Sequence, residues 1–151
     1  LIYLIMFSIE IDKDIYHGVD MINVDELIPH EKVVENKKNI LKYNLKYRDK
    51  SIIISSIIIC RKSNVIIDGH HRFTALKELN FNKIPVTKIN YLSEKIRVCD
   101  DNSILKEDVI NNAKKGKLYE PKSTKHSIRC NLKKEWVPVT LISSLFELRL
   151  D

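Results

Sequence analysis

Five consecutive residues in the middle of the chain combine side chains that suit a phosphate. They are Asp68, Gly69, His70, His71 and Arg72, and they supply a carboxylate, a residue without a side chain, two imidazoles and a guanidinium. A glycine lets a ligand approach the backbone closely, and the planar fork of an arginine holds a phosphate through two parallel hydrogen bonds. This combination indicates a phosphate or nucleotide site.

The segments on either side place this run at the start of a helix. Ser63–Ile67 predicts a turn followed by a buried strand, and Phe73–Leu79, with apolar residues three apart, predicts a short helix. At such a junction the unpaired backbone N–H groups and the positive end of the helix dipole attract anions. A capped helix with two incidental imidazoles is the alternative. Neighbouring helical residues point in different directions, so His70 and His71 are poorly placed to bind one metal ion together.

Two other polar motifs lie far from this run in the sequence. Pro29-His30-Glu31 is either an ordinary helix entry or the source of the carboxylate that phosphoryl transfer to a hydroxyl needs as a proton acceptor, with Glu31 as the candidate. Pro121–His126, with the sequence Pro-Lys-Ser-Thr-Lys-His, is either a surface loop or a site for a small zwitterion or a phosphate. Gly69 and Gly116 are two of only three glycines, and they lie in or just before these polar motifs.

Composition limits the possible classes of protein. The 151 residues suffice for one core of ordinary size with a small appendage. The net charge of +6 permits a nucleic-acid partner, but the lysines are scattered among acidic residues and no arginine-rich stripe occurs, which favours a solvated surface. Cys60, Cys99 and Cys130 are too far apart for a paired zinc motif or a disulfide framework.

Apolar patterning predicts the remaining elements. The expected strands and helices are a half-exposed strand at Ile9–Asp12, an amphipathic helix from Val33 to about Tyr47 with lysines on its outer face, a buried strand at Ile52–Cys60, a strand at Ile84–Ile89, a helix at Lys106–Lys115, strand-like segments at Ile128–Leu132 and Trp136–Thr140, and a closing helix at Leu141–Leu148. Asn80 is expected to end the helix that carries His71.

The apolar segment Leu1–Phe7 is too short to span a bilayer and lacks the basic leader and small-residue cleavage site of a signal peptide. We expect it to be a first strand, or in part sequence upstream of the natural start, since Met6 is a plausible initiator. The chain is therefore expected to be a soluble, cytoplasmic protein without a membrane partner.

The strand, the 68–72 run, the helix and the following Asn-Lys-Ile-Pro-Val at 82–86 together resemble the ParB/sulfiredoxin superfamily, whose shared Gly-x-x-Arg turn binds nucleotide phosphates. Within it the chain is most similar to the free serine kinases, both ADP-dependent and ATP-dependent. Their hallmarks are Pro-His-Glu, Asp-Gly-His-His-Arg and a late Pro-Lys-Thr-Thr-Arg-His. The same three motifs occur here in the same order, with Lys125 in place of the arginine and Ser123 in place of a threonine. The resemblance extends from about Ile9 to the C-terminus.

This resemblance implies an α+β fold, a compact mixed sheet with flanking helices and a small C-terminal extension. Residues 8–98 would form the nucleotide-binding core, and residues 99–151 would complete the substrate site. Only about twenty residues separate Val98 from Tyr119, so the chain lacks a region that the family members carry between the core and the late motif.

The resemblance also implies a role for each motif. The expected activity is phosphoryl transfer from ATP or ADP to free L-serine, giving O-phospho-L-serine for cysteine biosynthesis. The implied residues are Glu31 as the base, Asp68 as a second catalytic residue acting through Mg²⁺, Gly69, His70, His71 and Arg72 on the nucleotide phosphates, and Ser123, Thr124, Lys125 and His126 on the amino acid or its phosphorylated product.

Three alternatives stay open in the superfamily. A centromere-binding ParB protein carries a Glu-Asn-x-x-Arg box after the turn and then a helix-turn-helix domain, whereas here Glu35-Asn36 precedes the turn and lacks the arginine. Sulfiredoxin chemistry needs a cysteine in the turn, where this chain has His71. A ParB-like regulator or nuclease that binds nucleotide and DNA is the third alternative, and the net positive charge permits it.

Overall fold

A computed structural model describes residues 9–46, 51–132 and 134–149. Its strands, helices and two short 3₁₀ helices (η) follow in the order β1 (Tyr16–Asn23), η1 (Val24–Glu26), α2 (Glu35–Lys46), β2 (Ser51–Ser55), β3 (Ile57–Cys60), β4 (Ile66–Asp68), α3 (His70–Glu78), β5 (Lys83–Ile89), β6 (Ile96–Arg97), α4 (Lys106–Lys114), β7 (Ser127–Cys130), β8 (Glu135–Pro138), η2 (Val139–Ile142) and β9 (Leu145–Arg149). This mixture of strands and helices confirms the α+β class.

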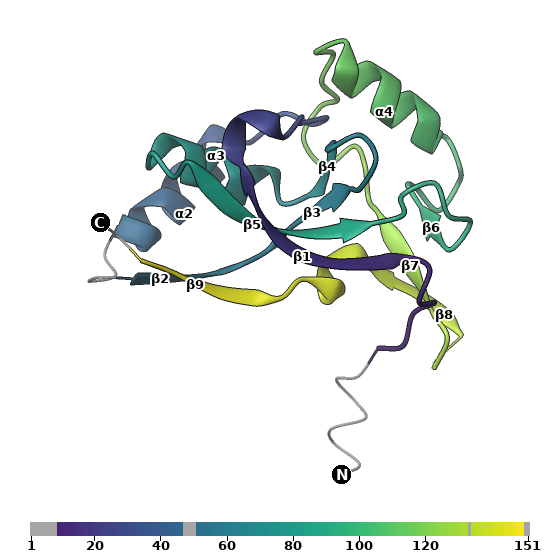
Figure 1. Ribbon diagram of the computed structural model, residues 1–151. Coiled ribbons are helices and arrows are strands. Elements are labelled where there is room, and N and C mark those ends of the chain that lie inside the picture. Colours follow the sequence, from purple (N-terminus) through teal and green to yellow (C-terminus); the bar gives the residue numbers. More distant parts are fainter. Residues whose placement is uncertain (1–8, 47–50, 133, 150–151) are drawn as a thin grey trace.

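A four-stranded mixed sheet forms the centre of the molecule, in the order β1-β5-β3-β4 (Figure 1). β3 runs parallel to β5, whereas β1–β5 and β3–β4 are antiparallel pairs. All four residues of β3, the sequence Ile-Ile-Ile-Cys, are buried. Such a continuous apolar run without alternation is typical of a strand that is covered on both faces.

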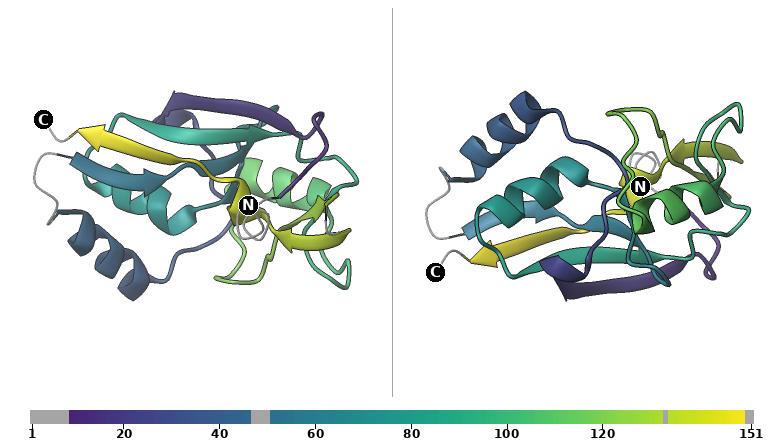
Figure 2. Two further views of the ribbon diagram at one scale, coloured as in Figure 1. Left: turned by 90° about the horizontal axis from the view of Figure 1, so that it is seen from below. Right: turned by 90° about the horizontal axis from the view of Figure 1, so that it is seen from above.

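Two smaller sheets flank the central one. β2 pairs with β9, and β6, β7 and β8 form a three-stranded antiparallel sheet. Figure 2 shows α2 and α3 side by side at the end of the molecule where β2 and β9 lie, with α4 and the three-stranded sheet at the opposite end. The segments between these two ends, residues 29–34 and 117–126, meet near the start of α3.

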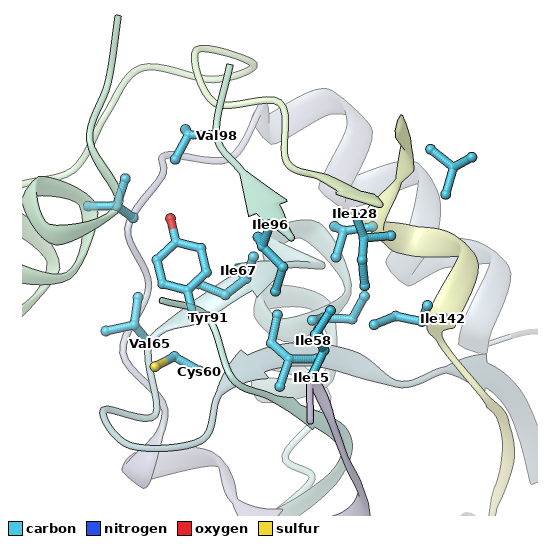
Figure 3. Packing of buried hydrophobic residues seen from close by; sticks show 14 of the residues in the cluster. Ile15, Ile58, Cys60, Val65, Ile67, Tyr91, Ile96, Val98, Ile128 and Ile142 are labelled. Atoms are coloured by element: carbon cyan, nitrogen blue, oxygen red, sulfur yellow. The ribbon is translucent and has the colours of Figure 1, made fainter. Parts of the chain in front are cut away.

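Buried side chains form two apolar clusters, and one of them joins the two ends of the sequence. It combines Ile15 and Ile58 with Ile128 and Ile142, all of them buried (Figure 3). Each fully buried side chain of this size contributes about 1.5–3 kcal/mol. Residues on both sides of position 98 therefore share one core.

Several expected elements are confirmed. β4 leads directly into α3, so the 68–72 run lies at a strand-to-helix junction. Asn80 follows α3 with a left-handed φ of 66°. The predicted strand at 84–89 is β5, and the predicted helix at 106–115 is α4, with Gly116 just beyond it at φ 73°.

The expected strand at Ile9–Asp12 is wrong, since these residues form no strand and a turn at 13–15 precedes β1. β1 shows little alternation because it is an edge strand, with most of its residues exposed on both faces. Its pairing with β5, which begins at Tyr16 opposite Ile89, is a long-range contact that local patterning does not report.

The closing helix expected at Leu141–Leu148 is also wrong. The chain forms η2 and then β9, which pairs with β2 from Leu145 opposite Ser55 to Arg149 opposite Ser51. The expected single strand at Ile52–Cys60 is divided at Ser56 into β2 and β3, which belong to different sheets. The two errors concern the same small sheet, in which β2 and β9 pair outside the central one.

The helix expected from Val33 to about Tyr47 is confirmed as α2, although Tyr47 lies outside the described residues. Its faces differ in part from the expectation. Ile40 is exposed, whereas Lys38 is buried and its ammonium contacts Glu35 at 2.7 Å and Glu78 of α3 at 2.9 Å. A buried lysine is tolerated when its charge is paired, and here it links α2 to α3.

The first strand expected at Leu1–Phe7 lies outside the described residues. Within the described part of the chain, no helix is long and apolar enough to cross a membrane.

Candidate functional site

The turn between β4 and α3 depends on Gly69. This residue has φ 105°, a left-handed value that L side chains rarely adopt, and it occupies the N-cap position of α3 without a side-chain cap. A Cβ atom here would lie 2.8 Å from Nη2 of Arg72 and 3.2 Å from Cγ1 of Ile57. Gly69 therefore permits the close approach of the Arg72 guanidinium, and the first turn of α3 keeps backbone N–H groups for an anionic ligand.

The Arg72 guanidinium is held on one side only. Its Nη2 donates a hydrogen bond to the carbonyl oxygen of Ser56 at 3.1 Å and lies 3.6 Å from Oδ2 of Asp68. Its buried Nε has no hydrogen-bond partner among the described residues. Arg72 also lines the cavity that Glu31 lines, so its guanidinium lies beside the space available to an anionic ligand.

The two imidazoles of the turn accept hydrogen bonds from another segment. Nε2 of His70 accepts from the backbone N–H of His30, and Nε2 of His71 accepts from that of Val34, both at 3.0 Å. Burial and neighbouring positive charges lower the pKa of both histidines. Each neutral ring therefore carries its hydrogen on Nδ1. The pair fixes the backbone on both sides of Glu31.

Glu31 lies where the segment 30–34 meets residues 117–126, which we call the late loop. The backbone N–H of Tyr119 donates to the carbonyl oxygen of His30, and a parallel bridge pairs Glu31 with Tyr119. The Ser123 backbone N–H donates to Oε1 of Glu31 at 3.0 Å, and the Thr124 hydroxyl lies 3.2 Å from Oε2. Burial raises the pKa of the Glu31 carboxyl group, although these hydrogen bonds oppose the shift. Such a carboxylate suits a general base.

Three histidines, one of them on the late loop, lie together. The His30 ring contacts the rings of His70 and His126, with centroid distances of 4.5 and 5.4 Å. Nε2 of His126 lies 2.7 Å from the hydroxyl of Tyr91. Burial lowers the pKa of all three histidines, so the cluster is uncharged at neutral pH.

A cavity of about 550 Å³ opens above these groups, a size typical of small-molecule sites. It brings together all but one of the predicted site residues, namely Glu31, Asp68, Gly69, His70, His71, Arg72, Thr124, Lys125 and His126. Ser123 is the exception, because it does not line the cavity and its hydroxyl donates to the carbonyl oxygen of Glu120 at 2.6 Å.

Other residues that line or support the cavity were not among the site residues predicted from the sequence. Lys122 lines the cavity beside His71 and also lies close to Lys37, which lowers the pKa of Lys37. Its place in the Pro-Lys-Ser-Thr-Lys-His motif was a usable signal. Ser56 and Tyr91, which hold Arg72 and His126, gave none, because both contacts link segments far apart in sequence.

Comparison with known proteins finds relatives of this chain by sequence and by structure. No family model matches the chain. An ATP-dependent L-serine kinase of Staphylothermus marinus is 32% identical over 83 residues, which is 52% of this chain and 32% of the relative. A ParB-like protein of Sulfolobus acidocaldarius is 34% identical over 92 residues, which is 61% of this chain and 45% of the relative. The chain resembles ParB-like proteins and L-serine kinases. The expected resemblance is thereby confirmed.

Solved structures agree on the fold. A free serine kinase in complex with AMP matches with a TM-score of 0.65 at 15% identity, covering 89% of this chain and 95% of that one. A mutant of a free serine kinase in complex with ADP matches with a TM-score of 0.66 at 14% identity and the same coverage. At this identity the likeness shows a shared fold. The chain spans less than half the length of the curated relatives that it matches.

Proposed function

We propose that the protein transfers a phosphoryl group from ATP or ADP to the hydroxyl of free L-serine and forms O-phospho-L-serine. The observation that carries this proposal is the position of Glu31, a half-buried carboxylate that lines the same cavity as the phosphate-binding turn at 68–72. A base and an anion site in one cavity are what phosphoryl transfer to a hydroxyl requires. The names of the sequence relatives support the choice of serine as acceptor.

The nucleotide phosphates bind at the start of α3 in this proposal. The first-turn N–H groups that follow Gly69 and the guanidinium of Arg72, which lines the cavity, donate to the phosphates. His70 and His71 accept backbone hydrogen bonds through Nε2, so they contribute through Nδ1–H if they contact the nucleotide directly.

Phosphoryl transfer to serine releases one proton, and Glu31 by itself can accept it. The serine hydroxyl oxygen attacks the terminal phosphorus of the nucleotide, and the bond from that phosphorus to the bridging oxygen breaks. The hydroxyl proton goes to Glu31, while the leaving nucleotide keeps the electron pair on its oxygen. Positioning and charge stabilisation supply most of the acceleration in such a transfer, and the half-buried Glu31 is raised in pKa toward the range of an effective base.

Asp68 is our candidate ligand for Mg²⁺. It lines the cavity next to the phosphate-binding turn and is partly exposed. Mg²⁺ is commonly bound by one or two carboxylates together with substrate phosphates and water, so a single aspartate fits this donor set. The ion would neutralise charge on the transferring phosphoryl group. Among the described residues, no group of three or more His, Cys, Asp or Glu side chains is suited to a metal ion.

The late loop forms the serine side of the site in this proposal. Thr124, Lys125 and His126 line the cavity, and the Ser123 backbone N–H orients Glu31. Lys125 is exposed, and its ammonium suits the carboxylate of an amino acid or the new phosphate. Residues 99–151 thus complete a site begun by residues 8–98, in an enzyme that we place in the cytoplasm, supplying cysteine biosynthesis.

An assay of product formation tests this proposal. The purified protein is incubated with L-serine, Mg²⁺ and either ATP or ADP, and O-phosphoserine is measured, with D-serine as the control acceptor. We expect product from L-serine with one of the two nucleotides. Failure with both contradicts the proposal. Salt-sensitive binding to duplex DNA without any response to serine would instead support a ParB-like regulator.

A further inference from the structure

A hydrogen-bond chain joins the side chains of Glu31, Thr124 and His30, and the last two of these are buried. Oε2 of Glu31 lies 3.2 Å from the Thr124 hydroxyl, and the same hydroxyl oxygen lies 2.9 Å from Nε2 of His30. The side chains of His30 and Thr124 are almost wholly buried, with relative exposures of 0% and 9%. Water therefore has little access to the hydrogen bond between Thr124 and His30.

The contact at the far end of this hydrogen-bond chain determines which nitrogen of the His30 ring carries the hydrogen. Nδ1 of His30 lies 2.5 Å from the carbonyl oxygen of Ile66. A carbonyl oxygen can only accept, so Nδ1 carries the hydrogen. Burial lowers the pKa of His30, which keeps the ring neutral. Nε2 of His30 is then unprotonated and can accept a hydrogen bond from the Thr124 hydroxyl.

Thr124 consequently has one hydrogen for two acceptors. When Glu31 is ionised, its Oε2 and Nε2 of His30 both need that hydrogen, and the carboxylate is the stronger acceptor. When Glu31 is protonated, its own O–H can donate to Oγ1 of Thr124, and the threonine hydrogen is released to His30. Every contact in the chain is satisfied only in the protonated state.

We propose that Thr124 is a positioning residue whose hydroxyl donates to Glu31 before phosphoryl transfer and to His30 after it. This inference rests on the proposed function, in which Glu31 receives the serine proton. The substrate O–H bond breaks and an O–H bond forms on Glu31, while Thr124 keeps its own hydrogen and His30 stays neutral. His30 thereby stabilises the protonated base without accepting a proton.

The surroundings of this chain contain both signs of charge. The titratable and charged groups near Glu31 and His30 are Lys32 on their own segment, Asp68 at the end of β4, His70, His71 and Arg72 on α3, Asp100 before α4, and Tyr119, Lys122, Lys125 and His126 on the late loop. The Asp68 charge favours protonation of His30, but the desolvation of the ring outweighs it. Glu31 is therefore the member of the chain that titrates.

Nuclear magnetic resonance of the full chain tests this directly without substrate. The ¹³Cδ shift of Glu31 and the ¹⁵Nε2 shift of His30 are followed against pH in the wild type, Thr124→Val and Thr124→Ser. We expect both nuclei of the wild type to move with one midpoint while Nδ1 keeps its hydrogen. The valine variant should lose the response at Nε2, and the serine variant should keep it. A constant Nε2 shift in the wild type, or an undiminished response in Thr124→Val, overturns the inference.

Kinetics separate this role from serine binding. We expect Thr124→Val to lower kcat about 10- to 100-fold with a KM for serine within about threefold of the wild type, and Thr124→Ser to recover most of kcat. A large rise in KM with unchanged kcat would mean that Thr124 only binds the amino acid. The titration decides the coupling even if no serine is phosphorylated, so failure of the proposed function and failure of this inference are distinguishable.

Discussion

The paired imidazoles of the 68–72 run hold the backbone of another segment in place. Each Nε2 is used to accept an N–H from the segment that carries Glu31. The neutral rings that this requires are maintained by burial and by nearby positive charge. The sequence indicated the polar chemistry of His70 and His71, but their role in holding the segment around Glu31 depends on contacts with residues 40 and 37 positions away.

Gly69 provides a residue-level test of the turn. Gly69→Ala should lower the free energy of unfolding by about 1–3 kcal/mol because of its left-handed φ. The new Cβ also displaces the Arg72 guanidinium, which lies 2.8 Å away. Losing a charged hydrogen bond to phosphate should weaken ATP or ADP binding about 10- to 100-fold, as measured by calorimetry.

The matched control is Gly116→Ala. Gly116 also has a left-handed φ, but a Cβ there meets nothing within 4 Å. This variant should be strained and yet bind nucleotide like the wild type. Equal losses of nucleotide affinity in both variants would contradict the role given to the turn.

Among the secondary-structure elements, the break at Ser56 explains why β2 and β3 belong to different sheets. The buried Ser56 hydroxyl lies 2.7 Å from that of Thr87 in β5 and accepts a hydrogen bond from the backbone N–H of Ser144 at 3.0 Å. Its carbonyl oxygen accepts from Arg72. Ser56 thus connects the central sheet, the segment before β9 and the turn at 68–72.

Ser56→Ala should therefore destabilise the protein by about 1–3 kcal/mol, because buried partners lose hydrogen bonds. Denaturant unfolding measures this difference. Ser55→Ala, one position earlier in β2 with the side chain only partly buried, should change the free energy of unfolding by less than about 0.5 kcal/mol. Similar values for the two variants would show that Ser56 is not the tie between these elements.

The same break marks the limit of prediction from the sequence. Segments with a strong local signal were predicted correctly, such as the strand and helix around the 68–72 run, Asn80 after α3 and Gly116 after α4. β1 and β9 were missed because their identity depends on partners, β5 and β2, far along the chain. Likewise the three motifs were visible in the sequence, whereas the contacts that join them, such as those of His30 with His70 and of Thr124 with Glu31, were not.

Across the whole molecule, three buried neutral histidines predict a steep dependence of stability on pH. Burial lowers the pKa of His30 and His70 and that of His126 to about 3. The unfolded chain, with histidine pKa values near 6.5, binds protons that the native state does not. Stability is then fully present above about pH 6.5 and falls as the pH is lowered, by up to about 1.4 kcal/mol per pH unit for each histidine.

Urea unfolding between pH 7.5 and 4.5 checks this dependence. In His126→Gln the slope of the free energy of unfolding against pH should fall by the contribution of about one bound proton. Glu31 acts in the opposite sense near pH 4.5, since its pKa is raised in the folded state. A free energy of unfolding that is constant from pH 7.5 to 5 would contradict the neutral histidine cluster.

The fold brings Glu31, the turn at 68–72 and the loop at 121–126 together around one cavity. Ser123 and Thr124, more than ninety positions along the chain, donate hydrogen bonds to the Glu31 carboxylate. A base at the meeting point of these segments is the central claim, and substitution of that one side chain tests it most directly.

The measurement compares O-phosphoserine formation by the wild type, Glu31→Gln and the control Glu120→Gln, whose exposed carboxylate pairs with Lys32. Glutamine keeps the size of the side chain but does not accept the proton. We predict a rate about 100- to 10,000-fold lower for Glu31→Gln with unchanged nucleotide binding, and a wild-type rate for Glu120→Gln. Undiminished product formation by Glu31→Gln would contradict the account.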